Sequence, residues 1–211
     1  MVERRFDYPV VLDVAGAQVL VVGAGPVAAR KAEGLAAAGA VVRMVAPEVS
    51  AEVDQALVAD LRRRVYRSSD LEGVRLVVTA TGDRDVDATV AADATSAGVW
   101  VNAADQPEDC SFILPAIARN GPLSVAVSTG GASPALAQRL RDRAGELLTD
   151  EVVALAETLA ARRAEVRHDG GSTEEVDWSP LIDPVVPARR RPDRAGSTDH
   201  PAPANDTRDE R

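Results

Sequence analysis

A glycine-rich turn near the start of this 211-residue chain is the first segment with recognisable chemistry. Gly23-Ala-Gly-Pro-Val-Ala28 follows an apolar run and opens an alanine-rich helical stretch. Without Cβ atoms in the way, backbone amides at a helix N-terminus can face the pyrophosphate of a dinucleotide. Ala28 replaces the third glycine, which serves close packing of helix on strand. The context predicts dinucleotide binding at Gly23 and Gly25; a simple tight turn is the alternative interpretation.

The end of the second expected strand bears on the choice between NAD and NADP. The acidic residue that grips the adenosine ribose usually stands there, but this chain has Ala46-Pro47, and Glu48 follows slightly late. No basic cluster comes after Ala46 to receive a 2′-phosphate, although Arg43 lies within the strand. The pattern favours NAD. A simple cap of the following turn is the other interpretation of Glu48.

A carboxylate follows a later strand, in the segment Val99-Trp-Val-Asn-Ala-Ala-Asp105. Open α/β sheets bind their ligands at the carboxyl ends of their strands. Asp105 is therefore a candidate acid or base. Asp-Gln-Pro also suits a chain reversal, so a turn-forming role for Asp105 stays open.

A second loop, Ser128-Thr-Gly-Gly-Ala-Ser133, precedes a helix that begins at Pro134. Exposed amides and the positive end of a helix dipole there could bind an anion such as a carboxylate. Arg139 and Arg143, four residues apart, could extend such a patch. A loop with Ser133 as helix cap is the equally simple alternative.

The elements that must position these residues alternate between strand and helix, which predicts a Rossmann-like, doubly wound parallel sheet. The pattern then changes to two further strands and two amphipathic helices, which form too thin a core to stand alone and indicate a dimer contact. The expected strands and helices are 18–22, 26–38, 41–45, 75–79, 85–97, 99–102, 111–114, 123–127, and helices from 134 and 150.

Three segments follow from this pattern. Residues 1–108 are expected to form the NAD-binding Rossmann domain, and 109–168 a small α+β module for dimerisation and substrate binding. Residues 169–211, rich in Pro, Gly, Ser and charge, are expected to be a disordered tail. Its one apolar island surrounds Trp178.

Composition excludes several function classes. The net charge of −9 argues against general nucleic-acid binding, and no apolar run is long enough to cross a membrane. The first residues lack the apolar stretch of a signal peptide, so we expect a cytoplasmic protein. One cysteine, Cys110, and two histidines, His168 and His200, give no ligand set for a metal site.

Four segments together resemble one family, the precorrin-2 dehydrogenases, to which the N-terminal part of siroheme synthase belongs. The resemblance covers roughly residues 5 to 165, and Arg30-Lys31 and the Ser-Thr-Gly-Gly-Ala-Ser-Pro block are its most specific parts. The segments are Val21–Lys31, Asn102–Asp105, Ser111–Pro115 and Val125–Pro134.

The resemblance implies NAD-dependent oxidation of precorrin-2 to sirohydrochlorin in siroheme biosynthesis, by a homodimer acting on a tetrapyrrole polycarboxylate. It implies that Asp105 is the essential aspartate. Thr129 stands where some members carry a modifiable serine, and sirohydrochlorin ferrochelatase activity is a further property of some members. The implied NAD contacts are Pro26, Val27, Pro47 and Glu48, and the implied substrate contacts are Asn102, Ser128, Thr129, Gly130, Gly131 and Ser133.

A function from a different class also fits the glycine turn. An NAD-sensing regulatory module would use the same Rossmann half without turnover, although it would not require Asp105 or the Ser-Thr-Gly-Gly block. An ordinary alcohol or hydroxy-acid dehydrogenase is a weaker alternative, because the chain lacks a Tyr-x-x-x-Lys pair and a suitably placed histidine.

Overall fold

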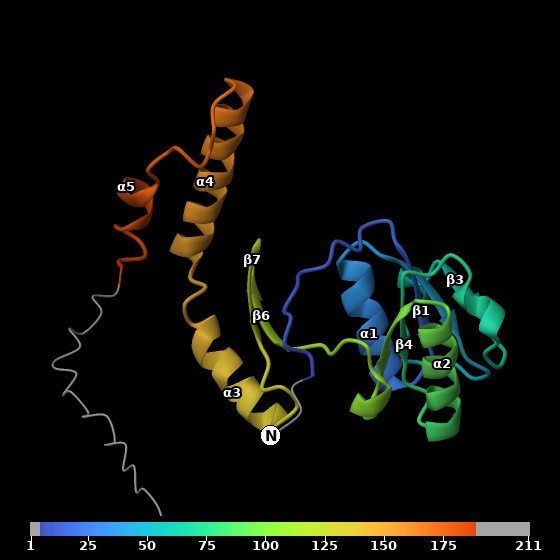
Figure 1. The fold of residues 1–211 in the computed structure, drawn as a ribbon. Helices are drawn as coiled ribbons and strands as arrows, with labels where there is room; N and C mark the ends of the chain where they lie inside the picture. The colour runs from blue at the N-terminus through green and yellow to red at the C-terminus, as the bar shows by residue number, and fades with distance from the viewer. Residues whose placement is uncertain (1–4, 189–211) are drawn as a thin grey trace, which may run out of the picture. The chain divides into compact units, whose positions relative to one another are not determined.

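The computed structural model describes residues 5–188, and a five-stranded parallel sheet dominates its first part (Figure 1). The strand order is β3-β2-β1-β4-β5, so the chain winds outward in both directions from β1. The strands are β1 (Gln18–Val22), β2 (Val41–Val45), β3 (Asp60–Arg62), β4 (Leu76–Thr79) and β5 (Trp100–Ala103). This is the doubly wound sheet that the sequence predicts, with every strand pair parallel.

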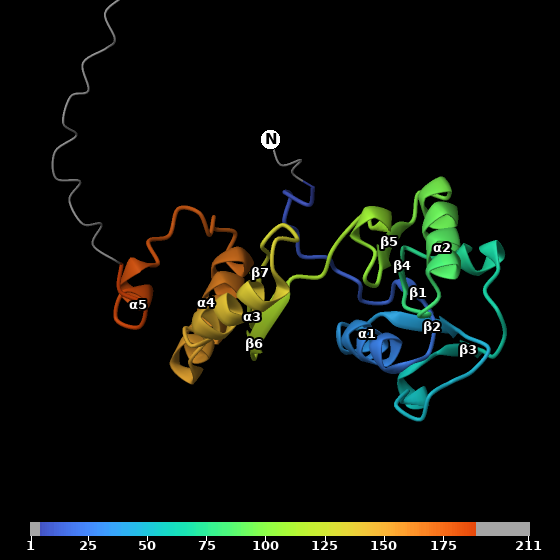
Figure 2. The same cartoon turned by 90° about the horizontal axis from the view of Figure 1, so that it is seen from below.

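Two helices cover opposite faces of this sheet, as Figure 2 shows. Helix α1 (Pro26–Ala37) buries Ala28, Ala29 and Ala32 against one face. Helix α2 (Arg84–Ser96) buries Val90, Ala91 and Ala94 against the other. Small alanines let each helix approach the sheet closely, which suits a chain with only 3% aromatic residues.

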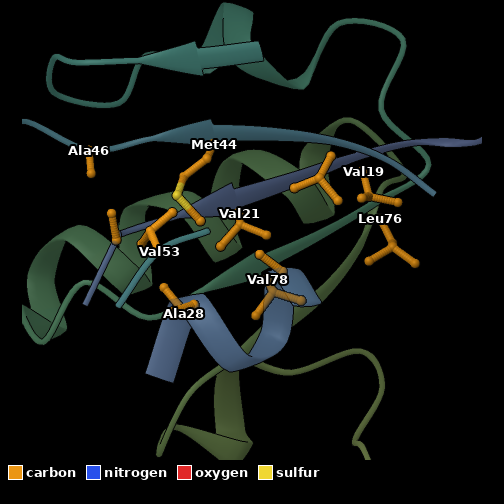
Figure 3. Packing of buried hydrophobic residues seen from close by; sticks show 12 residues of the cluster. Val19, Val21, Ala28, Met44, Ala46, Val53, Leu76 and Val78 are labelled. Carbon is orange, nitrogen blue, oxygen red and sulfur yellow. The ribbon is translucent and has the colours of Figure 1, made fainter. Parts of the chain in front are cut away.

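Successive strand residues point to opposite faces, and both faces are apolar because both are covered. In β1, Val19 and Val21 join the cluster under α1, whereas Leu20 and Val22 join the cluster under α2. Figure 3 shows the α1 side, where Val21, Met44 and Val78 pack above Ala28. This rigid core fixes the carboxyl ends of the strands.

Most of the expected elements of this domain are confirmed to within a residue or two. Strand β3 has no counterpart in the sequence prediction, because Asp-Leu-Arg is a short polar segment at a sheet edge. Three 3-10 turns were also unexpected: η1 (Gln55–Leu57), η2 (Ser68–Leu71) and η3 (Pro107–Asp109).

The expected strand at 111–114 is wrong. That segment is irregular, and the strand lies further on at β6 (Ala116–Asn120), joined by Gly121-Pro122 to β7 (Leu123–Val127). The amide nitrogens of Ser111 and Phe112 instead donate to the Val101 carbonyl oxygen at 2.8 and 3.3 Å. A short apolar run can be held beside a strand end in this way without joining a sheet.

Helices α3 (Pro134–Gly145) and α4 (Asp150–His168) begin where the sequence predicts. The Ser133 hydroxyl accepts a hydrogen bond from the Leu136 amide, and Thr149 does the same for Val152. Leu136 and Leu140 stay 48% and 41% exposed, so α3 is incompletely covered within one chain. The described chain divides into two compact units, and the second comprises residues 119–123 and 146–188.

The expected tail is only partly described. Within residues 169–188 there is a one-turn helix, α5 (Ser179–Ile182), and the Trp178 indole donates to the Thr173 carbonyl oxygen at 3.0 Å. Residues 189–211 lie outside the described residues, and so does the expectation of disorder for them. No helix in the described part of the chain is long and apolar enough to span a membrane.

Candidate active site

The glycine turn lies between β1 and α1, and its first glycine cannot be replaced without strain. Gly23 has φ +101°, and a Cβ added there would lie 2.3 Å from the Ala80 carbonyl oxygen. The Gly23 amide donates to the Val45 carbonyl oxygen at 2.9 Å. Gly23 therefore lets the turn pass directly against the ends of two neighbouring strands.

Gly25 serves a different purpose. It is the N-cap of α1, where no side chain satisfies the first amides of the helix, and a Cβ added there would meet no atom within 4 Å. Pro26 occupies the first helical position, and Ala28 is fully buried where the third glycine of the fingerprint would stand. Uncapped amides beside open space fit the pyrophosphate of NAD.

The loop after β2 is tied to this turn. The Ser50 amide donates to the Ala24 carbonyl oxygen at 3.0 Å, and Pro47 and Glu48 lie exposed just before it. Pro47 and Glu48 thus border the glycine turn, where the adenosine part of NAD would lie.

Arginines near the end of β2 are held by carboxylates. Arg43 donates to Asp60 at 3.0 Å and to the Asp70 carbonyl oxygen at 3.0 Å. Arg62 and Arg64 both pair with the fully buried Asp70 carboxylate at 2.6 Å. Burial would raise the pKa of Asp70, but hydrogen bonds from Arg64, the Arg67 amide and Arg62 lower this pKa to about 2. These guanidinium groups are engaged by carboxylates, which agrees with NAD as the cofactor.

A hollow of about 270 Å³ opens beside the glycine turn, at the carboxyl ends of β4 and β5. We call it the Asp105 pocket. Open α/β sheets bind ligands at this edge, so the pocket could hold the reacting end of the dinucleotide and part of a substrate. Its lining residues are Val27, Ala80, Gly82, Arg84, Asp87, Ala104, Asp105 and Gln106.

Asp105 adopts a left-handed backbone conformation, with φ +60°. The Gln106 amide donates to the Ala103 carbonyl oxygen at 3.3 Å, so residues 103–106 form a β-turn with Asp105 at its third position. A positive φ at the third position but not at the second, Ala104, indicates a type II turn, and that third position normally takes Gly or Asn. An aspartate held there stores strain at the pocket wall, a feature common at functional sites.

Asp87 is a second carboxylate of the pocket, which the sequence patterns did not predict. It is 3% exposed and accepts hydrogen bonds from the Thr79 hydroxyl, the Thr81 amide at 3.1 Å and the Thr81 hydroxyl at 2.8 Å. Gln106 approaches its other oxygen at 3.5 Å. Asp87 thereby connects the loop after β4 to the turn that carries Asp105. An acidic residue one turn into a helix that follows a strand was the available signal.

Lys31 brings positive charge toward the Asp105 carboxylate. Burial and the neighbouring Arg30 lower the pKa of its ammonium group, while Asp105 and Cys110 act in the opposite direction. Lys31, part of the Arg30-Lys31 pair that is distinctive in the sequence, thus belongs to the surroundings of Asp105.

Asn102 does not line the pocket. It is 7% exposed, and its amide donates to the Phe112 carbonyl oxygen at 3.1 Å and approaches Cys110 Sγ at 3.6 Å. The Asn102 side chain therefore holds the backbone at Phe112 against the end of β5, next to the Asp105 turn.

The predicted Ser-Thr-Gly-Gly-Ala-Ser loop borders another hollow of about 270 Å³, the Ser128 pocket, which is mostly apolar. The Thr129 hydroxyl accepts from the Ser133 amide and donates to the Ser133 carbonyl oxygen, both at 3.1 Å. Ser128 accepts from the Gly130 amide at 3.1 Å. The hydroxyls thus shape the loop itself. The lining residues are Ile113, Leu114, Pro115, Ala116, Val127, Ser128, Thr129, Gly131, Pro134, Ala137 and Gln138.

Comparison with known proteins gives two family matches. Residues 10–116 match the family described as "Putative NAD(P)-binding", and residues 120–143 match "Sirohaem biosynthesis protein central". The siroheme synthase of Ectopseudomonas mendocina is 47% identical over 134 residues, which cover 63% of this chain and 29% of that protein. The siroheme synthase of Stutzerimonas stutzeri is 41% identical over 191 residues, or 86% and 41% of the two chains. The chain therefore spans well under half the length of these relatives.

A solved structure is similar over nearly its full length. The precorrin-2 dehydrogenase SirC superposes with a TM-score of 0.62 and 30% identity, covering 84% of this chain and 87% of SirC.

Sheet order, glycine turn and uncapped helix N-terminus define a dinucleotide-binding protein of the Rossmann class that uses NAD. The family matches and the similarity to SirC identify the family within this class. The chain belongs to the precorrin-2 dehydrogenase family, as the resemblance of its sequence motifs indicated.

Proposed function

We propose that this protein oxidises precorrin-2 to sirohydrochlorin with NAD, in siroheme biosynthesis. The observation that carries the proposal is Asp105 in a strained turn, lining the same pocket as Val27 of the helix that begins at the glycine turn. A base and a dinucleotide are what removal of a proton and a hydride requires. The similarity to SirC supports the choice of substrate.

The protein's own residues would bind the cofactor and accept the proton. Gly23 and Gly25 keep space for the pyrophosphate, and the amides of α1 face it; Pro26, Val27, Pro47 and Glu48 border the bound cofactor. Bound NAD supplies the hydride acceptor. Asp105 accepts the proton that the substrate loses.

The substrate-binding role of the second loop remains part of the proposal. Gly130 and Gly131 have φ +60° and +85°, so the loop needs glycine at both places. Ser128, Thr129 and Ser133 hold its shape through their hydroxyls, and Asn102 holds the Asp105 turn from below. We infer that these residues support substrate binding chiefly by shaping backbone.

A homodimer completes the proposal. Helix α4 has no buried residue among those described, and Leu136 and Leu140 leave an apolar stripe on α3. A second copy that covers these helices would remove this apolar surface from water. We place the contact in the module of residues 109–168, after the Rossmann domain of residues 1–108.

The experiment is spectroscopic. Purified protein with NAD and freshly prepared precorrin-2 should produce NADH and sirohydrochlorin in equal amounts. An NAD-sensing module would bind NAD and produce neither. Iron insertion is measured separately by adding Fe²⁺ to sirohydrochlorin, where a rate above the spontaneous one would assign ferrochelatase activity as well.

A further inference from the structure

The buried thiol of Cys110 contacts both ends of the turn that presents Asp105. The Ala103 amide donates to Cys110 Sγ at 3.2 Å, and the Gln106 carbonyl oxygen lies 3.3 Å from the same sulfur. The Ala103 carbonyl oxygen is also 3.3 Å away. Ala103 and Gln106 are the first and last residues of the turn, so Sγ links the two ends of the turn that carries Asp105.

The thiol can play both hydrogen-bonding roles at neutral pH. Burial raises the pKa of Cys110, so the sulfur keeps its proton. It then donates to one carbonyl oxygen while accepting from the Ala103 amide. Donation to Gln106 joins the two ends of the turn.

The backbone of Cys110 is fixed by contacts outside the turn. The Arg5 guanidinium donates to the Cys110 carbonyl oxygen at 2.8 Å and to Pro107 at 3.1 Å. The next residue, Ser111, exchanges hydrogen bonds with Val101, at 2.8 Å to its carbonyl oxygen and 2.7 Å from its amide. The sulfur is therefore an anchored point against which the turn is held.

The turn needs such an anchor because its own geometry is weak. Its closing hydrogen bond is long, at 3.3 Å, and its third residue is a left-handed aspartate. A left-handed backbone is unfavourable for residues other than glycine, although aspartate tolerates it better than most. Without a further contact, the turn can lower its energy by moving Asp105 away from the pocket.

We propose that Cys110 is a positioning residue for Asp105, holding the turn of residues 103–106 closed by hydrogen bonds from and to Sγ. The proposal rests on the function proposed above, in which Asp105 takes the substrate proton. Cys110 is absent from the lining of the Asp105 pocket, so it acts only through the turn.

The test compares Cys110→Ala, which removes both hydrogen bonds, with Cys110→Ser, which keeps a group that donates and accepts. Cys110→Ala should lower kcat with precorrin-2 by about tenfold to a hundredfold, because a small misplacement of a catalytic group costs that much. The Kd for NAD should stay unchanged, and Cys110→Ser should recover most of kcat. Val42→Ala, which truncates a fully buried residue on β2, controls for general destabilisation and should leave kcat unchanged.

A double variant separates positioning from a packing role. In an Asp105→Asn background, Cys110→Ala should cause no further loss of kcat, since there is no carboxylate left to position. Independent losses, or equal kcat in Cys110→Ala and Cys110→Ser, would overturn the proposal.

A measurement that needs no substrate tests the role of Cys110 independently of the proposed function. Hydrogen exchange at the Ala103 amide should accelerate about tenfold or more in Cys110→Ala and stay slow in Cys110→Ser. A wild-type chain that cannot oxidise precorrin-2 refutes the proposed function. Unchanged exchange at Ala103 in Cys110→Ala refutes the role of Cys110, whatever the wild-type activity.

Discussion

Gly23 and Ala80 lie so close that no side chain fits between them: a Cβ added at Gly23 would clash with the Ala80 carbonyl oxygen at 2.3 Å. The turn after β1 thus passes directly over the end of β4. Two residues later, at Gly25, the space is empty. The fold therefore requires the first glycine, whereas the second is required only by the cofactor site proposed above.

Substitutions at the two glycines should separate these requirements. Gly23→Ala should lower the free energy of unfolding by about 1–3 kcal/mol or more, because the backbone conformation is strained for alanine and Ala80 cannot yield. Gly25→Asp should fold normally but bind NAD at least about a hundredfold more weakly, because its carboxylate repels the pyrophosphate. Denaturant titration and calorimetry measure the two effects. Equal stability of the two variants would contradict this division.

The wild-type protein should be no more stable than the Asp105→Gly variant. The type II turn favours glycine at this position, so Asp105→Gly should leave the free energy of unfolding unchanged or raise it by up to about 1 kcal/mol. Asp105→Ala should lower it by about 1 kcal/mol, because alanine disfavours positive φ. Urea titration of both variants is the measurement. A large loss of stability in Asp105→Gly would mean that the carboxylate, rather than the backbone, holds the turn.

Acid should weaken the fold partly through Asp70. The pKa of its carboxyl is depressed to about 2 in the folded chain, so its stabilisation is present above the ordinary value of 3.8 and is lost as pH falls toward 2. Asp70→Asn should cost about 2–3 kcal/mol near neutral pH, and its difference from wild type should shrink below pH 4.

The matched control for Asp70 is Glu108→Gln. Glu108 pairs with Arg84 at 3.1 Å on the surface, and removing that pair should change stability by less than about 0.5 kcal/mol. A difference between Asp70→Asn and wild type that is independent of pH would exclude the carboxylate as the cause.

The apolar stripe on α3 should hold the dimer together. Light scattering at micromolar concentration should give twice the chain mass for wild type, and the double variant Leu136→Gln, Leu140→Gln should be a folded monomer. Leu57→Gln, at a leucine of similar exposure in η1, should leave the mass unchanged. A monomeric wild type would refute the proposed homodimer.

The local patterns of the sequence predicted the sheet and the glycine turn, because apolar periodicity and glycine requirements are local. The end of β5 was harder to predict. The run Ser111–Leu114 has the composition of a strand, yet its hydrogen bonds go to Val101 at the end of β5. That preference depends on tertiary position. The contacts of Cys110 could not be predicted either, because nothing local in the sequence indicates that the turn at Asp105 would hydrogen-bond to its sulfur.

The buried network around Asp87 shows the same limit. Its partners Thr79 and Thr81 lie at the end of β4, and Gln106 lies after β5, so the four residues meet only once the sheet has formed. Position at the carboxyl end of a strand was sufficient to predict that Asp105 lies at this edge of the sheet, because that rule depends on topology alone.

The most direct test compares turnover of precorrin-2 by wild type and Asp105→Asn at saturating NAD. Asparagine tolerates the left-handed turn and removes only the negative charge, so the variant should fold, dimerise and bind NAD as wild type does. NADH formation should be readily measured for wild type and about a hundredfold slower for Asp105→Asn. Near-normal turnover by Asp105→Asn would contradict the account, because the substrate proton would then pass to another group.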